Sequence, residues 1–192
     1  MVICIYGAAS DKIKDDYKKE CYDLALILAK SGHSLVYGAG SSGMMGASAR
    51  GFKDGGGKVH GVIPTFFEEN GFEKIFYDAD RITRTKTMAE RKTIMENECD
   101  AFIVTPGGMG TMEEFFEALT LKQLGRHKKA IVVYNMFGYY DKLEELILDM
   151  IDKGFVNKEC LKLFAILKEK QEIVEYLNAY SAGSVTWDLL KK

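Results

Sequence analysis

Short apolar runs alternate with longer amphipathic segments along almost the whole chain. Short, nearly continuous apolar runs are typical of strands inside a parallel sheet, and apolar residues at helical spacing indicate helices with one buried face. The predicted strands are Val2–Tyr6, Ser34–Tyr37, Lys58–Ile63, Arg81–Arg84, Ala101–Val104, Lys129–Tyr134 and, at an edge, Ala165–Leu167. The predicted helices are Asp15–Lys30, Met44–Asp54, Thr87–Asn97, Gly110–Leu124, Tyr140–Lys153, Lys158–Phe164 and Gln171–Asn178.

This alternation predicts a single-domain α/β fold, a doubly wound (Rossmann-like), mostly parallel sheet with helices on both faces. We expect residues 1–178 to form the domain and residues 179–192 to be a C-terminal tail. Between Thr65 and Asp80 the periodicity is lost, which predicts a loop with a short helical turn and suggests a lid. Ligands of such sheets bind beyond the carboxyl ends of the strands, where three glycine-containing turns are expected to converge. These turns lie at Gly7, Gly38–Gly43 and Gly107–Gly110.

Composition narrows the partners to small molecules. The chain has 192 residues, 47% of them hydrophobic, and a net charge of −2, so nothing favours nucleic acid or a membrane surface as a partner. The four cysteines are widely spaced without a CxxC pair, which predicts neither a zinc site nor a disulfide framework. With no targeting segment and no apolar run of membrane-spanning length, the expected location is the cytoplasm.

The stretch Pro106–Glu114 places a glycine-rich turn between the strand Ala101–Val104 and the next helix. Glycines at 107, 108 and 110 are expected to take positive φ and to let the backbone approach a ligand. The unpaired N–H groups of the helix start, together with Thr111, would then bind an anion, above all phosphate. A common structural turn, with Glu113 and Glu114 complementing the helix dipole, is the alternative.

A second glycine loop, Gly38–Gly43, reads Gly-Ala-Gly-Ser-Ser-Gly and matches GxGxxG. A dinucleotide fingerprint belongs to the first βαβ unit and needs an acid at the end of the following strand. This loop follows the second strand, and the next one ends in Pro64-Thr65 without an acid. We therefore expect this loop to bind a nucleotide or to be a purely structural turn, and we do not expect it to bind NAD.

The Pro106–Glu114 stretch resembles the PGGxGTxxE signature of the LONELY GUY family of cytokinin riboside 5′-monophosphate phosphoribohydrolases, long labelled "lysine decarboxylase-like". Met88–Lys92 resembles that family's second signature, an Arg-Lys pair on a helix, although a solvated charged face is the alternative. Ala39 and Ala89 depart from a glycine and a histidine that many members carry. The resemblance covers residues 1 to about 178 and implies that the domain binds nucleotides and hydrolyses the N-glycosidic bond of a nucleoside 5′-monophosphate.

The resemblance also implies roles for individual residues. Glu114 is expected to face the anomeric carbon and activate water, and Arg91 to orient that carboxylate and the ribose and keep the acid ionised. Gly107, Gly108, Gly110 and Thr111 are expected to hold the 5′-phosphate. The remaining expected substrate-binding residues are Glu113, Lys92, Met88, Ser10, Gly40, Gly43, Thr120 and a lid carboxylate such as Glu69. No metal and no cofactor is expected.

Three functions stay open on the sequence. The first is cytokinin activation, the second is a general AMP nucleosidase with the same chemistry, and the third is a non-catalytic nucleotide-binding sensor or carrier. The decarboxylase label lacks support, because the sequence has no lysine in a pyridoxal-phosphate motif. By resemblance a homodimer or larger assembly is expected, with the helix face around Phe115 as the predicted contact.

Overall fold

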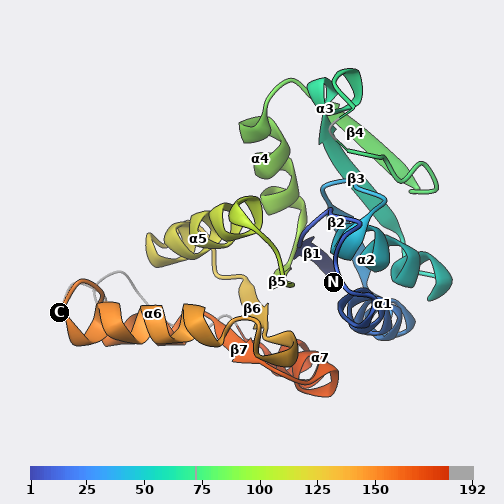
Figure 1. Ribbon diagram of the computed structural model, residues 1–192. Coiled ribbons are helices and arrows are strands. Elements are labelled where there is room, and N and C mark those ends of the chain that lie inside the picture. The colour runs from blue at the N-terminus through green and yellow to red at the C-terminus, as the bar shows by residue number, and fades with distance from the viewer. Residues whose placement is uncertain (72, 182–192) are drawn as a thin grey trace.

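The computed structural model describes residues 1–71 and 73–181, which form one α/β layer structure (Figure 1). Its strands are β1 (Val2–Tyr6), β2 (Ser34–Tyr37), β3 (Val59–Pro64), β4 (Arg81–Thr85), β5 (Ala101–Val104), β6 (Ala130–Tyr134) and β7 (Ala165–Leu167). Its α-helices are α1 (Asp15–Lys30), α2 (Gly43–Asp54), α3 (Thr65–Glu69), α4 (Met88–Glu98), α5 (Met109–Gln123), α6 (Asp141–Asp152) and α7 (Lys170–Ala179). Two 3-10 helices, η1 (Met136–Gly138) and η2 (Lys158–Lys162), complete the described elements.

The described strands form one parallel sheet in the order β4-β3-β2-β1-β5-β6-β7. The chain winds outward from β1 to β4, returns to pair β5 with the other side of β1, and then winds outward again. Ile3 accordingly pairs with Leu35 of β2 on one side and with Ala101 of β5 on the other. The doubly wound fold class is confirmed, and the order reverses between β1 and β5, which is where such sheets open a crevice.

Helices cover both faces of the sheet and define two apolar cores (Figure 1). On one face α1, α2 and α7 pack on side chains such as Ile3, Leu35 and Tyr37. On the other, α4, α5 and α6 pack on Phe102 and Val104. Complete burial of one such large side chain contributes about 1.5–3 kcal/mol, so the sheet is held rigidly from both sides.

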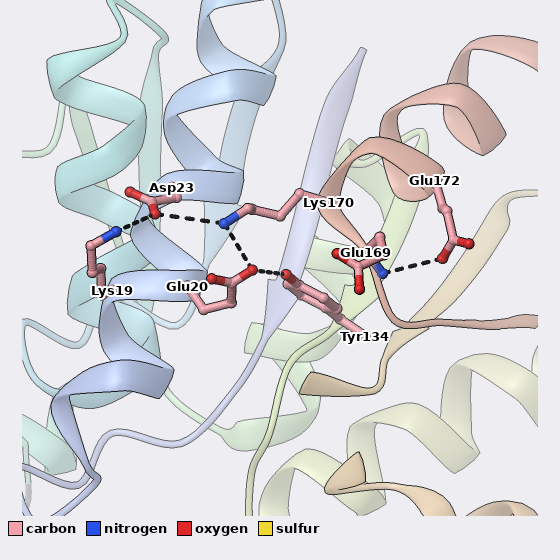
Figure 2. A network of polar contacts seen from close by, with 7 residues as sticks. All are labelled: Lys19, Glu20, Asp23, Tyr134, Glu169, Lys170 and Glu172. Atoms are coloured by element: carbon pink, nitrogen blue, oxygen red, sulfur yellow. Dashed lines mark hydrogen bonds and ion pairs between the residues drawn. The ribbon is translucent and has the colours of Figure 1, made fainter. Parts of the chain in front are cut away.

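A polar network fastens the last helix to the first (Figure 2). Glu20 of α1 accepts hydrogen bonds from the Tyr134 hydroxyl, at 2.7 Å, and from the Lys170 ammonium, at 2.8 Å. Glu169 and Glu172 form a capping box at the start of α7. The buried Tyr134 therefore has its polar partner, and α7 is fixed beside the carboxyl end of β6.

The folded unit extends past the predicted boundary at residue 178. Lys122 is buried in α5 and donates to the Leu163 carbonyl, at 2.6 Å, and to the Tyr180 hydroxyl, at 3.0 Å. Tyr180 in turn donates to the Lys128 carbonyl at 2.9 Å. The start of the predicted tail is thus packed on the domain, while residues 182–192 lie outside the described residues.

Within residues 1–71 and 73–181, no helix has both the length and the apolar character needed to cross a membrane. The four cysteines are all free and buried, in keeping with the absence of a predicted disulfide framework.

Candidate functional site

The main cavity lies at the switch point, beyond the carboxyl ends of β1 and β5. It has a volume of about 330 Å³, within the range of small-ligand sites. Segments far apart in the sequence build it: the loop after β1, the start of α2, the lid helix α3, α4 and the start of α5. The lining residues are Gly7, Ala8, Ala9, Ser10, Met45, Phe67, Met88, Arg91, Gly108, Gly110, Thr111, Glu113 and Glu114.

The amino-terminal end of α5 forms one wall of this cavity. Gly108 is its N-cap residue, and no described side chain caps the helix there. The first amides of a helix have no partner within it, so N–H groups beside Gly110 and Thr111 remain available where those residues line the cavity. Together with the helix dipole, this end of α5 suits a negatively charged group.

The glycines of this turn matter for a different reason than the sequence suggested. Positive φ was expected at 107, 108 and 110, and that expectation is wrong, because none of the three is among the positive-φ glycines. A Cβ on Gly107 would lie 2.0 Å from the Thr111 hydroxyl oxygen, whereas a Cβ on Gly108 or Gly110 would meet nothing within 4 Å. Gly107 therefore permits the turn itself, and the other two leave room in front of the helix end.

Glu114 lies in the second turn of α5 and lines the cavity. Burial raises its pKa to about 7, while the positive charge of Arg91 lowers the pKa and Glu113 raises it. Arg91 acts in the direction expected from the sequence, since its charge favours the ionised acid, but burial outweighs this attraction. A carboxyl group with a pKa near 7 is suited to exchanging protons at neutral pH.

Arg91 of α4 is 4% exposed and reaches the cavity from the opposite side. Its Nε donates to the Val62 carbonyl and its Nη2 to the Gly38 carbonyl, both at 3.1 Å. The guanidinium carbon lies 5.7 Å from the centre of the Phe67 ring. No carboxylate of the described residues lies within ion-pair distance of Arg91, so its charge is balanced mainly by backbone dipoles and remains available to a ligand.

Lys92 does not line the cavity, although the resemblance placed it among the substrate ligands. Its ammonium lies 2.5 Å from Glu113 and 2.5 Å from Glu117, both on α5. Its side chain is 13% exposed. Of Lys92, Glu113 and Glu117, only Glu113 lines the cavity.

The second glycine loop supports the site without lining it. The helix end that follows it is already occupied, since the Ala8 carbonyl accepts from the Met44 amide at 2.8 Å and from the Met45 amide at 3.3 Å. Gly43 has φ +57°, and a Cβ there would lie 2.5 Å from the same carbonyl oxygen. Neither Gly40 nor Gly43 borders the cavity, and this occupied helix end favours α5 over α2 as the place for an anion.

Neither the predicted Glu69, which is exposed at the end of α3, nor Glu73 lines the cavity, but the charge of Glu73 raises the pKa of Glu114. The lid pairs with the second glycine loop, because the Ser41 amide donates to the Lys74 carbonyl at 2.7 Å and Gly40 bridges Ile75. One Glu73 oxygen is buried without a hydrogen-bond partner among the described residues. Burial raises the pKa of Glu73, and Arg91 lowers it.

The other predicted residues divide into two groups. Ser10 and Met88 line the cavity, whereas Thr120 is exposed further along α5 and does not. Phe115, around which a subunit contact was predicted, is fully buried and packs edge-on against Phe164 at a centroid distance of 5.7 Å. Its own side chain is therefore closed to a partner, and the exposed aromatic residue of α5 is Phe116.

Sequence reasoning missed a second cavity on the other side of the loop after β1. It has a volume of about 320 Å³ and shares Ala8 and Gly108 with the main cavity. Its other lining residues are Ile13, Lys14, Tyr17, Pro106, Gly107 and Tyr139. Only the position of these residues beyond the carboxyl ends of β1, β5 and β6 could have indicated it.

For residues 1–71 and 73–181, no group of three or more His, Cys, Asp or Glu side chains is arranged to hold a metal ion. The cavity instead combines an uncapped helix end, a buried cation and a carboxyl group that titrates near neutrality. This combination suits binding of a phosphorylated molecule and acid-base chemistry on it.

Comparison with known proteins connects these features to a family. The family model described as "Possible lysine decarboxylase" matches residues 45–177. The chain is 35% identical over 177 residues to the probable cytokinin riboside 5′-monophosphate phosphoribohydrolase LOGL3 of Oryza sativa subsp. japonica, covering 92% of this chain and 83% of the relative. It is 34% identical over 178 residues to the cytokinin riboside 5′-monophosphate phosphoribohydrolase LOG2 of Arabidopsis thaliana, covering 93% and 83%.

Solved structures share the architecture at lower sequence identity. The molybdenum cofactor carrier protein MCP of Chlamydomonas reinhardtii gives a TM-score of 0.69 at 21% identity, covering 93% of this chain and 98% of the other. The molybdenum cofactor binding protein of Rippkaea orientalis gives 0.68 at 18%, covering 93% and 95%. At such identities the likeness shows the fold alone.

Proposed function

The chain belongs to the LONELY GUY family, and from this premise we propose that it hydrolyses the N-glycosidic bond of a purine nucleoside 5′-monophosphate. The products are the free base and ribose 5-phosphate. One observation carries the proposal: the uncapped end of α5 and the half-buried Glu114 of its second turn line the same cavity. A phosphate bound at the end of α5 places the attached sugar beside Glu114.

The 5′-phosphate binds at the start of α5, where Gly108 and Gly110 leave the backbone amides accessible and Thr111 adds a hydroxyl. Gly107 shapes the turn rather than touching the ligand. Because the phosphate is remote from the bond that breaks, its binding energy holds the anomeric carbon in place for reaction.

Glu114 activates the water. Its carboxylate accepts a proton from the water as the water oxygen bonds to the anomeric carbon and the bond to the base nitrogen breaks. The departing base nitrogen takes up a proton from solvent, and Glu114 returns its own proton to solvent, so that one water is divided between the two products. The carboxylate also stabilises the positive charge that develops on the sugar. With a pKa raised to about 7, Glu114 is basic enough to take that proton and is still partly ionised at neutral pH.

Arg91 presents its Nη1, which also donates to the Met88 sulfur at 3.8 Å, to the ribose or to Glu114, because Nε and Nη2 are held by carbonyls. Glu113 and Ser10 are placed to bind ribose hydroxyls, and the flexible side chains of Met45 and Met88 to cover the base. Gly40 and Gly43 act through the loop that supports this wall. In place of the predicted Glu69, Glu73 acts on the site through its charge.

The finer parts of the proposal concern substrate, assembly and location. We place both AMP and cytokinin riboside 5′-monophosphate within the substrate range, and we place the protein in the cytoplasm. We also propose a homodimer or larger assembly through the exposed apolar side of α5, where Met109 is 90% and Phe116 is 37% exposed.

Following base release from AMP and from isopentenyl-AMP tests the function. We expect release from at least one nucleotide, and loss of turnover by 10²-fold or more, as an order of magnitude, in Glu114→Gln. Nucleotide affinity should stay within a few-fold, because the amide keeps the shape of the side chain. Glu175→Gln, at an exposed position of α7, is the matched control and should behave as the parent.

The runner-up is a non-catalytic nucleotide-binding sensor or carrier on the same fold. Binding of both nucleotides without release of base from either would favour it and contradict the hydrolase. Release from AMP but not from isopentenyl-AMP would define an AMP nucleosidase, and the reverse would define cytokinin activation.

A further inference from the structure

We propose that Lys92 is a positioning residue, which ties α4 to α5 and thereby fixes Glu114 relative to Arg91, and that it does not bind substrate. This inference rests on the proposed function, since it concerns the same site. It reassigns a residue that the resemblance placed among the ligands.

The geometry around Lys92 is a two-point attachment. Its ammonium contacts Glu113 and Glu117, each at 2.5 Å, and these residues are one helical turn apart on α5. A single contact would let one helix slide or roll against the other, whereas two contacts a turn apart restrain both movements. The Lys92 side chain is 13% exposed, whereas those of Glu113 and Glu117 are 54% and 37% exposed, so solvent partly screens these ion pairs and their effect is chiefly on geometry.

The attachment acts directly beside the reacting groups. Lys92 follows Arg91 on α4, and Glu113 precedes Glu114 on α5. Successive helical residues point in different directions, so Arg91 and Glu114 face the cavity while Lys92 and Glu117 meet between the helices. A displacement of one helix against the other would therefore change the separation of Arg91 and Glu114.

Lys92 is poorly placed to bind substrate itself. It lines neither the main nor the second cavity. Its ammonium already contacts two carboxylates, and withdrawing it toward a ligand would leave Glu113 and Glu117 without their cation. The positive charge that faces the cavity is that of Arg91.

The charges around Glu114 give the attachment a measurable signature. From α4, Arg91 and Lys92 both lower the pKa of Glu114; from α5 and the lid, Glu113 and Glu73 raise it. The charge of Glu114 in turn contributes to raising the pKa values of Cys4 and Tyr6 of β1. Removing Lys92 deletes one cation and leaves Glu113 uncompensated, and both effects raise the pKa of Glu114.

The test is a ¹³C NMR titration of the Glu114 carboxyl in ligand-free protein, assigned by comparison with Glu114→Gln. We expect Lys92→Met to move the titration midpoint of Glu114 to higher pH and Lys92→Arg to restore it toward the parent. In base release, Lys92→Met should lower kcat about 10-fold with little change in KM, and should move the acidic limb of the pH profile upward.

Lys170→Met is the matched control. Lys170 also bonds a carboxylate across two helices, Glu20 at 2.8 Å, and it is similarly shielded, but it lies at the α1–α7 contact (Figure 2). We expect it to leave the Glu114 midpoint and the pH profile unchanged. Thermal unfolding shows which variants fold, and Lys92→Gln takes the place of Lys92→Met if the latter does not.

An unchanged Glu114 midpoint in the folded Lys92 variant would overturn the inference, as would a raised KM at unchanged kcat, the signature of a lost ligand. Because the titration is made without substrate, it decides the inference even if the parent releases no base. Absence of base release by the parent would contradict the proposed function but not this inference.

Discussion

Three glycines around the start of α5 are alike in sequence but differ in what a side chain would meet. A methyl group at Gly107 would collide with the nearly buried Thr111, and one at Gly110 would project into open space beside the cavity. Glu114, in the second turn of α5, has a pKa that burial raises to about 7. Gly107 is therefore needed for folding, Gly110 for access of the ligand to the helix end, and Glu114 for the chemistry.

The contrast between the two glycines is testable by alanine substitution. Gly107→Ala should destabilise the protein by about 1–3 kcal/mol, because it overpacks the turn. Gly110→Ala should be as stable as the parent or more stable by up to about 1 kcal/mol, because alanine favours helix. It should still weaken nucleotide binding by about 10-fold, since the methyl group stands before the amides. Urea denaturation and calorimetric titration with AMP measure the two effects, and unchanged affinity in Gly110→Ala would contradict the phosphate assignment.

Glu114→Gln should stabilise the protein in a pH-dependent manner. The folded-state pKa of about 7 lies above the ordinary value of 4.5, so the folded protein binds a proton that the unfolded chain releases between these limits. The parent therefore loses stability as pH rises from about 4.5 to 7. The variant lacks this loss and should exceed the parent at pH 8 by on the order of 2 kcal/mol, with a smaller difference at pH 5. Thermal melts at both pH values check this, and an equal or lower stability at pH 8 would argue against a buried acid.

At the scale of elements, the protein uses two glycine-rich helix starts in opposite ways. The start of α2 is occupied by the Ala8 carbonyl, which joins the loop after β1 to the second glycine loop. The start of α5 has no side-chain cap among the described residues and opens into the cavity. One helix end therefore stabilises the scaffold, and the other is left for a ligand.

This division predicts different behaviour of two positions in the second loop. Gly43→Ala should cost about 2–4 kcal/mol, since φ is +57° and the new Cβ would meet the Ala8 carbonyl. Ala39→Gly should change stability little, because relief of its left-handed conformation, φ 65°, is offset by lost methyl burial and a freer unfolded chain. Urea midpoints measure both, and a harmless Gly43→Ala would contradict the scaffold role.

Most elements could be predicted because their signals are local. The ranges of β1, α1 and β5 follow from continuous apolar runs and from helical spacing, and they agree with the structure. The motif Pro106–Glu114 likewise indicated the start of α5 and Glu114. Local periodicity is sufficient where an element buries one face against the sheet.

What could not be predicted depends on contacts between distant segments. Glu73 lies beside Gly40, and its charge acts on Glu114, because the 65–80 segment pairs with Gly40 and Ser41, and no sequence spacing expresses that pairing. The same holds for Lys92, which only the family resemblance placed among the substrate-binding residues, and whose contacts with Glu113 and Glu117 no sequence spacing expresses. Absence of positive φ at the α5 glycines also depends on tertiary context rather than on residue type.

At the scale of the whole molecule, the strand order determines where chemistry is possible. The order in which the chain adds strands reverses between β1 and β5, although all the described strands are parallel. Cavities open on both sides of the loop after β1. The two apolar cores hold this edge from both faces. The α1–α7 network (Figure 2) and the Lys122–Tyr180 contact fix α7.

The Lys122–Tyr180 contact should contribute to global stability. Burial lowers the pKa of Lys122 to about 8, so the ammonium is costly to bury at neutral pH and depends on its oxygen partners. Tyr180→Phe removes one of them and should lower the free energy of unfolding by about 1–2 kcal/mol. Urea denaturation at pH 7 measures this. A stability equal to that of the parent would show that the hydrogen bond from Lys122 to Tyr180 does not contribute to folding.

The central claim is that the start of α5 holds the 5′-phosphate and thereby brings the anomeric carbon to Glu114. A crystal structure of Glu114→Gln with AMP tests it most directly. We predict phosphate oxygens at about 2.7–3.2 Å from the backbone amides at Gly110 and Thr111, with the side chain at position 114 facing the anomeric carbon. Phosphate bound in the second cavity or against the Gly38–Gly43 loop would contradict the account.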